Sequence, residues 1–258
     1  MAKTLEDGVA FAQQVRAGAN MPFGWSSLPA PMNAGALARG GFKAVCVDMQ
    51  HSFHDEASTF ASIQAVHQAG SVAGLRIPVG RFDLASRALD ASAQFVIAPM
   101  INTVADAQAF VAAMKYPPIG GRSWGPAMAL DLFGAAPADY LACANDMVLA
   151  IAMIETVEAQ ENLDAILAVP GIDGVFVGPS DLSITLAQGA RIEATAPHVL
   201  EAAGNIGTRA RQAGKVAGVY AFDAEKAQAF FDRGFTFAAV GSDALSLKAS
   251  AAVGSSIG

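Results

Sequence analysis

The chain has 258 residues, of which 53% are hydrophobic and 15% charged, and its net charge is −7. This length suits one α/β barrel of about 250 residues, and so low a charged fraction indicates that other subunits cover part of the surface. The acidic balance argues against a nucleic-acid partner, which needs clustered Lys and Arg, and prolines interrupt the longest uncharged stretch, 17–38, so no membrane span is expected.

Short apolar segments alternate with helical patterns along the chain. The expected strands are rich in Val, Ile and Phe and apolar on both faces, as buried parallel strands are. They lie at 21–25, 44–48, 72–77, 94–99, 147–154, 174–178, 216–221 and 236–240. Thr103 and Asp106 form a capping-box-like helix start, Asp223 can cap a later helix, and Gly234 can end it.

Eight strands alternating with helices favour a (β/α)8 TIM-type barrel, with residues 1–258 as a single domain. A doubly wound open sheet is the runner-up, but no expected strand is followed by a Gly-x-Gly-x-x-Gly turn. One long irregular region, 117–137, is interpreted as a lid or interface loop. Cys46 and Cys143 are too few for a disulfide framework, and the first residues form no apolar signal core. We therefore expect buried free thiols and a cytoplasmic location.

Polar residues follow the second expected strand. Asp48 and Gln50 should point the same way along the chain, and His51 begins the loop. Histidine is the side chain best suited to proton transfer near neutral pH, so His51 is a candidate base. A solvated loop histidine is the alternative, and the nearby His54 is a second candidate. His67 and His198 are interpreted as structural.

Two charged residues occupy unusual positions. Arg76 ends an apolar strand, where a buried guanidinium is costly unless it is paired. It is either the partner of a core carboxylate or a clamp for an anion or a carbonyl group. Asp90 lies at the end of an expected helix, where a negative charge opposes the helix dipole, so another interaction should hold it there. An exposed Asp without a role is equally consistent with the sequence.

Two carboxylates lie just past neighbouring strands. Glu155 follows the strand at 147–154, and Asp181 follows the strand at 174–178. Because parallel strands end at one face of a barrel, the two carboxylates should meet and suit a hard divalent metal ion. Helix capping is the alternative. Between them, Gly178, Pro179 and Ser180 lead into a helix whose N-terminus can bind a carboxylate. Trp25, Trp124 and Phe222 can shape a pocket mouth, although large aromatic residues more often pack in a core.

Several stretches of the sequence form one recognisable set. They are Val47-Asp-Met-Gln-His51, Leu75-Arg-Ile-Pro78, Leu89-Asp90, Ala98-Pro-Met100, Tyr116-Pro-Pro-x-Gly-x-Arg122, Ile154-Glu-Thr156 and Asp173-Gly-Val-Phe-Val-Gly-Pro-Ser-Asp-Leu182. In this order and spacing, over about residues 20–245, the chain resembles the HpcH/HpaI family of metal-dependent (class II) pyruvate aldolases. The run that ends at Leu182 is the most specific part of the resemblance.

The resemblance implies an assembly and a set of roles. The last helix would pack onto a neighbouring subunit in a homo-hexamer, a dimer of trimers. Glu155 and Asp181 would hold Mg²⁺ or Mn²⁺, with Co²⁺ or Zn²⁺ as other possibilities. Arg76 would bind the ketone oxygen and stabilise the enolate. His51 would act as the base through a water molecule, and Asp90 of an adjacent subunit would orient it.

The resemblance also implies a substrate site. Backbone amides near Ser180 would bind the substrate carboxylate; the substrate-binding set is Trp25, Asp48, Gln50, Gly178, Pro179 and Ser180. Two residues depart from the usual pattern of the family. Many members have Glu at the position of Gln50 and Gln at the position of Met153, so substrate preference is the property that these departures leave open.

The expected reaction is reversible cleavage of a 4-hydroxy-2-oxo acid into pyruvate or hydroxypyruvate and an aldehyde. No lysine lies at the carboxyl end of an expected strand, which argues against an imine mechanism. Three alternatives stay open: a 2-oxo diacid decarboxylase, a CoA-thioester carbon–carbon lyase, and a non-catalytic barrel that binds a 2-oxo acid.

Overall fold

The computed structural model describes residues 3–255, and its centre is a closed barrel of eight parallel strands in sequence order. The strands are β1 (Met21–Ser26), β2 (Ala44–Asp48), β3 (Val72–Arg76), β4 (Phe95–Ala98), β5 (Leu149–Ile154), β6 (Gly174–Val177), β7 (Val216–Tyr220) and β8 (Phe237–Ala239). Strand β8 pairs with β1 and closes the barrel. The predicted (β/α)8 fold is therefore confirmed, and every expected strand is present within two residues of its predicted ends.

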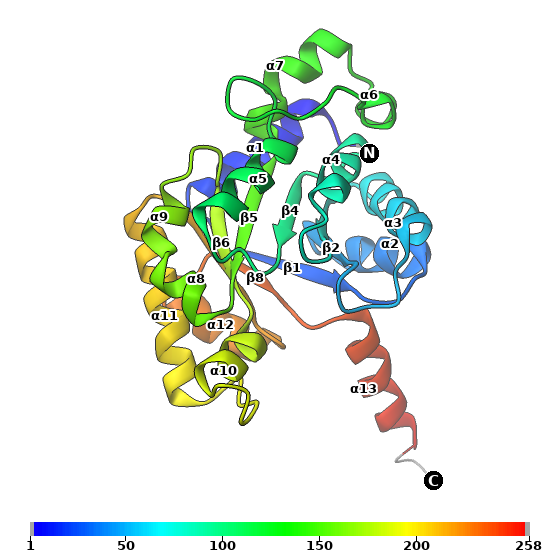
Figure 1. Ribbon diagram of the computed structural model, residues 1–258. Helices are drawn as coiled ribbons and strands as arrows, with labels where there is room; N and C mark the ends of the chain where they lie inside the picture. Colours follow the sequence, from blue (N-terminus) through cyan, green and yellow to red (C-terminus); the bar gives the residue numbers. More distant parts are fainter. Residues whose placement is uncertain (1–2, 256–258) are drawn as a thin grey trace.

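Helices surround the barrel (Figure 1). They are α1 (Leu5–Arg16), α2 (Pro31–Arg39), α3 (Glu56–Gln68), α4 (Phe82–Asp90), α5 (Val104–Met114), α6 (Ala127–Phe133), α7 (Pro137–Met147), α8 (Val157–Glu161), α9 (Leu163–Leu167), α10 (Pro179–Leu186), α11 (Pro197–Gln212), α12 (Ala224–Asp232) and α13 (Asp243–Ser255). The predicted caps are confirmed. Thr103 and Asp106 form a reciprocal capping box at the start of α5, and the Asp223 side chain accepts from the Lys226 amide at the start of α12.

The barrel interior is filled by aromatic rings. Phe23 stacks on Phe237 with ring centroids 4.3 Å apart, and Phe95 meets both rings edge-on. Gly74 on β3 makes room for this cluster, because a methyl group built on it would lie 2.2 Å from the Phe95 ring. The interior is thus a packed core, and a cavity for chemistry has to lie at one end of the strands.

Two glycine variants test this packing. Gly74→Ala should destabilise the fold by about 1–3 kcal/mol, the usual cost of overpacking a core, because Phe95 has to move. Gly204→Ala on α11 is the matched control, since a methyl group there would meet nothing within 4 Å. It should be neutral or stabilising by up to about 1 kcal/mol. Urea unfolding measures the free energy of unfolding of both variants, and equal values would contradict the close packing of Phe95 against Gly74.

The segment after α5 differs from the expected irregular loop. It contains α6, and its residues form a separate small core with α1 and α7: Tyr116, Ala129, Phe133, Tyr140, Ala144 and Met147, with Leu5 and Val9 against them. The expectation failed because α6 has only seven residues, too few to show a clear helical period, and the glycines around it, Gly120, Gly121, Gly125 and Gly134, suggested a loop. The expectation of two buried free thiols is confirmed for Cys46. It is wrong for the burial of Cys143, whose side chain is only half-buried.

Helix α13 leaves the barrel and extends away from it (Figure 1). It contacts β1 and α2. Leu245 and Leu247 are 49% and 57% exposed, which leaves apolar surface on this helix open to water. Across residues 3–255, no helix combines the length and the apolar character that a membrane crossing requires.

Candidate active site

A cavity of about 250 Å³ opens at the carboxyl ends of the strands. Its lining comes from the ends of β1, β2, β3, β5, β6 and β7 and from the loops that follow them: Trp25, Ser27, Asp48, His51, Arg76, Met153, Gly178, Pro179, Ser180, Asp181, Tyr220 and Phe222. In (β/α)8 enzymes this face carries the active site. Most of the predicted site residues therefore meet in one place.

Asp48 and Arg76 form a bidentate ion pair in the lining of the cavity. The register of β2 and β3 places the two residues side by side, and the guanidinium Nε and Nη2 donate to the carboxylate at 2.8 and 2.6 Å. Asp48 also accepts from the indole N–H of Trp25 at 3.3 Å, and the Arg76 guanidinium lies 4.9 Å from the Trp25 ring centroid. The predicted core partner of Arg76 thus exists, and the same guanidinium faces the cavity.

This pairing fixes the charge and the orientation of Arg76. Burial alone would lower the pKa of Arg76, but hydrogen bonds and the charge of Asp48 outweigh it and raise the pKa above its usual value. Asp48 engages Nε and Nη2, so Nη1 is the guanidinium nitrogen that it does not bind. A permanently charged donor held in this way is suited to stabilising a negatively charged oxygen.

The two candidate histidines have different surroundings. His51 is exposed on the loop after β2, lines the cavity, and donates its backbone N–H to Asp48 Oδ1 at 3.3 Å. His54 is 7% exposed, and its ring nitrogens lie 3.3 Å from the hydroxyl groups of Ser26 and Ser58. Burial lowers the pKa of His54. Of these two histidines, His51 is the one that lines the cavity.

Glu155 and Asp181 lie close enough to influence each other. Burial, followed by the charge of Asp181, raises the pKa of Glu155 to about 7. Neither carboxylate is a helix cap: Thr156 caps α8, and α10 has no side-chain cap at Gly178. The capping alternative is therefore wrong, and the cost of bringing two carboxylates together needs another explanation.

The surroundings of Glu155 suit a hard cation. Its Oε1 accepts from the backbone N–H of Met100 at 3.0 Å. A methyl group built on Gly178 would lie 2.6 Å from Oε2 and 2.5 Å from Cε of Met153, so a larger residue there would displace both side chains. Within residues 3–255 no three or more His, Cys, Asp and Glu side chains gather as a metal site. Two carboxylates are nevertheless a sufficient protein contribution for a Mg²⁺-type ion, whose other ligands are water and substrate.

The first turn of α10 forms the cavity wall beside Asp181. Pro179 occupies the first helical position, and Ser180 and Asp181 follow it. The amides of a first helical turn have no partner within the helix, so they can donate to an anion. The Gly178–Ser180 turn thus offers a carboxylate site next to the two acidic side chains.

Three predicted site residues do not line the cavity of this chain: Glu155, whose Oε2 lies next to Gly178, Gln50 and Asp90. Gln50 is half-buried, and its side-chain carbonyl oxygen is buried without a hydrogen-bond partner among the described residues. Asp90 ends α4 and accepts a 2.6 Å hydrogen bond from Arg122, whose side chain is 0% exposed. This ion pair is the interaction that holds Asp90 against the helix dipole. Arg122 belongs to a motif that the sequence singled out without a role.

Other cavity residues were missed or left without a role by sequence reasoning. Ser27, Tyr220 and Met153 line the cavity, and Phe222 is a wall residue with a φ of 65°. Tyr220 packs edge-on against Trp25 at 5.3 Å. Their position at the ends of β1, β5 and β7 was the available signal, since all strands of a parallel barrel end at the same face.

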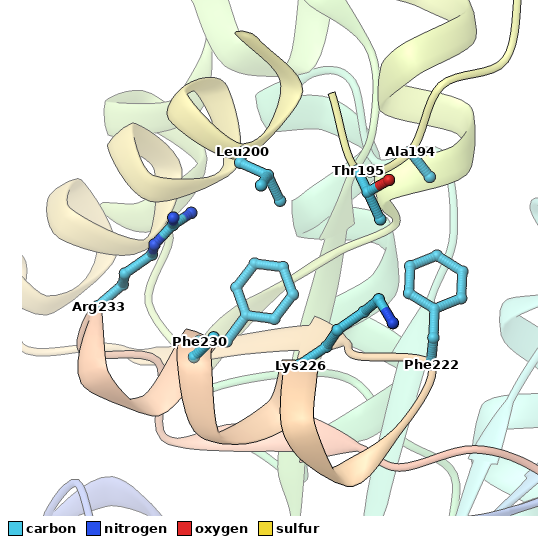
Figure 2. A pocket seen from close by; sticks show the side chains of 8 residues that line it. Ala194, Thr195, Leu200, Phe222, Lys226, Phe230 and Arg233 are labelled. Atoms are coloured by element: carbon cyan, nitrogen blue, oxygen red, sulfur yellow. The ribbon is translucent and has the colours of Figure 1, made fainter. Parts of the chain in front are cut away.

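A second hollow of about 120 Å³ lies between α11 and α12 and shares Phe222 with the cavity. Figure 2 shows Leu200 and Thr195 on one side, facing Phe230 and Lys226 on the other. Its lining is mostly apolar and contains no predicted base or metal carboxylate. The acid–base groups belong to the cavity at the strand ends.

A closed (β/α)8 barrel that gathers a histidine, an arginine–carboxylate pair and two further carboxylates at its carboxyl end is the architecture of a barrel enzyme. The profile of the family described as HpcH/HpaI aldolase/citrate lyase matches residues 23–249. The chain belongs to this family, and it is an aldolase, a carbon–carbon lyase.

Relatives span almost the whole chain. The hydroxypyruvate/pyruvate aldolase of Rhizorhabdus wittichii is 38% identical over 88% of this chain and 90% of its own length. The 5-keto-4-deoxy-D-glucarate aldolase of Salmonella paratyphi A is 34% identical over 93% of this chain and 90% of its own. A crystal structure of an HpcH/HpaI aldolase/citrate lyase family protein from Burkholderia cenocepacia has a TM-score of 0.85 at 29% identity, covering 96% of this chain and 98% of that chain.

Proposed function

We propose that this aldolase reversibly cleaves 4-hydroxy-2-oxo acids into pyruvate or hydroxypyruvate and an aldehyde, with a divalent metal ion held by Glu155 and Asp181. The observation that carries the proposal is the meeting of Asp181, Arg76 and His51 around one cavity, with Glu155 beside Gly178 of its lining and close enough to Asp181 for their charges to interact. The names of the relatives, a hydroxypyruvate/pyruvate aldolase and a 5-keto-4-deoxy-D-glucarate aldolase, support the substrate class.

Each group has a part in the reaction. The metal ion, Mg²⁺ or Mn²⁺ in this proposal, supplies Lewis-acid polarisation of the 2-oxo acid. Arg76 directs its free Nη1 at the ketone oxygen and stabilises the negative charge that develops there. The amides near Ser180 bind the substrate carboxylate, and Trp25, Asp48 and Arg76 line the same cavity.

His51 moves the proton of the 4-hydroxyl group. In the cleavage direction it removes this proton through a water molecule while the bond between C3 and C4 breaks. The released electron pair forms the enolate of the 2-oxo acid, and protonation at C3 then gives pyruvate. Asp90 of an adjacent subunit orients His51 in this proposal, which agrees with its absence from the lining of the cavity of its own chain.

The proposed assembly is a homo-hexamer, a dimer of trimers, in the cytoplasm. The apolar residues that α13 exposes, Leu245 and Leu247 among them, support its packing against a neighbouring copy. The low charged fraction of 15% supports the same arrangement.

The function is tested by following products. The enzyme with Mn²⁺ is incubated with a 4-hydroxy-2-oxo diacid and, separately, with oxaloacetate. The proposal predicts release of pyruvate and an aldehyde from the first compound, and loss of this activity on addition of EDTA. Carbon dioxide from oxaloacetate without cleavage of the hydroxy acid would contradict it in favour of a decarboxylase.

Metal affinity should depend on pH around neutrality. Because the pKa of Glu155 is raised to about 7, proton and metal compete for it below that pH. The apparent association constant should fall about tenfold for each pH unit below 7 and change little above it. Calorimetric titration with Mn²⁺ at pH 6, 7 and 8 measures the affinity and the protons released. The same affinity at all three values would contradict the role of Glu155.

Replacing His51 by alanine should reduce aldol cleavage by about 10²–10⁴-fold, the usual contribution of a general base. Metal affinity should not change, because His51 is assigned to proton transfer. His198→Ala on the exposed surface of α11 is the matched control and should leave both properties intact. Loss of metal binding in His51→Ala would instead make His51 a ligand.

A further inference from the structure

Asp243, the first residue of α13, is a buried carboxylate beside the cavity that has no part in the proposed chemistry. It is 6% exposed. Its Oδ1 accepts from the backbone N–H of Ser27 at 2.8 Å, and its Oδ2 accepts from the Leu28 N–H at 3.3 Å and the Ser26 hydroxyl at 3.2 Å. Three consecutive residues at the end of β1 thus donate to one side chain that is more than 200 residues away in sequence.

These donors are part of the cavity wall. Ser27 lines the cavity, and Ser26 directly follows Trp25, whose indole ring contacts Asp48 and Arg76. A buried carboxylate is costly unless hydrogen bonds satisfy it, and hydrogen bonds to a charged group are stronger than neutral ones. The bonds to Asp243 therefore fix the direction in which the chain leaves β1.

A second set of contacts extends from this wall to the loop of the candidate base. The Ser26 hydroxyl lies 3.3 Å from Nε2 of His54, and the backbone N–H of Phe53 donates to the Ser27 carbonyl at 3.2 Å. His51 lies on the same loop, between Asp48 and Phe53. The wall is therefore held from two sides, by Asp243 and by the loop that carries His51.

We propose that Asp243 is a positioning residue of the site: it holds the wall formed by Trp25, Ser26 and Ser27 in place and connects that wall to the start of α13. The proposal rests on the proposed function for the identity of the cavity as the substrate site, but the fixed position of Trp25 can be tested without a substrate.

The test compares three variants, Asp243→Ala, Asp243→Asn and Ser242→Ala, each made in a Trp124→Phe parent. Trp25 and Trp124 are the two tryptophans of the chain, so Trp124→Phe leaves Trp25 as the fluorescent reporter. Asp243→Ala removes all the bonds to the wall, and Asp243→Asn keeps one acceptor oxygen. Ser242→Ala is the matched control, because the Ser242 hydroxyl accepts from the Leu245 N–H and so supports the start of α13 without contacting the wall.

Asp243→Ala should shift the Trp25 emission to longer wavelength, because the indole ring, which is 3% exposed in the parent, becomes more exposed to solvent. The KM for the 2-oxo acid should rise about tenfold while kcat changes much less, since the lost bonds shape a binding wall. Asp243→Asn should lie between this variant and the parent, and Ser242→Ala should match the parent in both properties. If Asp243→Ala fails to fold, Asp243→Asn carries the comparison.

Unchanged Trp25 emission in both Asp243 variants would overturn the inference, and so would a fall in kcat with constant KM. An enzyme that cleaves no 4-hydroxy-2-oxo acid but shows the emission shift would overturn the proposed function and leave the position of the wall supported.

Discussion

Replacing Arg76 by methionine is expected to lower kcat by about 10²–10³-fold, the effect of removing one donor that stabilises a developing oxyanion. Methionine keeps much of the volume of the side chain but removes the charge. The KM should change less, because the donor is most important when the ketone oxygen becomes negative. Steady-state kinetics with a 4-hydroxy-2-oxo acid measure both constants.

The same change removes the partner of Asp48, so folding needs its own control. Breaking a buried ion pair costs about 3–5 kcal/mol when the remaining charge is left without partners. Asp48 keeps the N–H donors of Trp25, Gln50 and His51, which reduces this cost. Arg76→Met combined with Asp48→Asn removes both charges and should recover stability without recovering kcat. Near-normal turnover in either variant would exclude the role of Arg76.

Replacing Glu155 by glutamine should change metal binding and stability in opposite directions. Glutamine has the same shape but cannot be a negatively charged ligand, so the metal affinity and the aldolase activity should be lost. The metal-free protein should become more stable above pH 7. A carboxyl group whose pKa is raised from 4.5 to about 7 in the folded protein binds more protons there than in the unfolded chain between these values.

Stability of the metal-free wild type should therefore fall as the pH rises from 4.5 to 7 and stay low above it. Glu155→Gln removes this charge and should raise the free energy of unfolding of the metal-free protein by up to about 3 kcal/mol at pH 8, since one pKa unit corresponds to about 1.4 kcal/mol. Thermal unfolding at pH 8 with EDTA and with Mn²⁺ separates the two effects. Wild-type stabilisation of Glu155→Gln by Mn²⁺ would show that Glu155 is not a ligand.

The barrel and most of its cavity could be predicted from the sequence because the relevant information is local. Each strand is a short apolar run, and the ends of parallel strands share one face of a barrel. Glu155 and Asp181 could thus be placed together without knowing a single contact. The pairing of Asp48 with Arg76 follows from the same rule, since both residues end neighbouring strands.

The rest depends on contacts between distant segments. The position of Asp90 at the end of α4 opposes the helix dipole, and the ion pair with Arg122, 32 residues later, explains it. The hydrogen bonds that the backbone N–H groups of Ser27 and Leu28 donate to Asp243 join the first strand to the last helix, and no local sequence pattern indicates them. The raised pKa of Glu155 likewise needs the burial and the neighbouring charge that only the folded chain provides.

The central claim is that this site converts a 2-oxo acid to its enolate with the help of a metal ion. Proton NMR of pyruvate and of hydroxypyruvate in D₂O tests it without knowledge of the aldehyde. The account predicts that the C3 proton signal disappears with enzyme and Mg²⁺ or Mn²⁺, and persists when EDTA is added or Glu155 is replaced by glutamine. The faster of the two acids identifies the nucleophile. A C3 signal that persists for both acids with either metal would contradict the account.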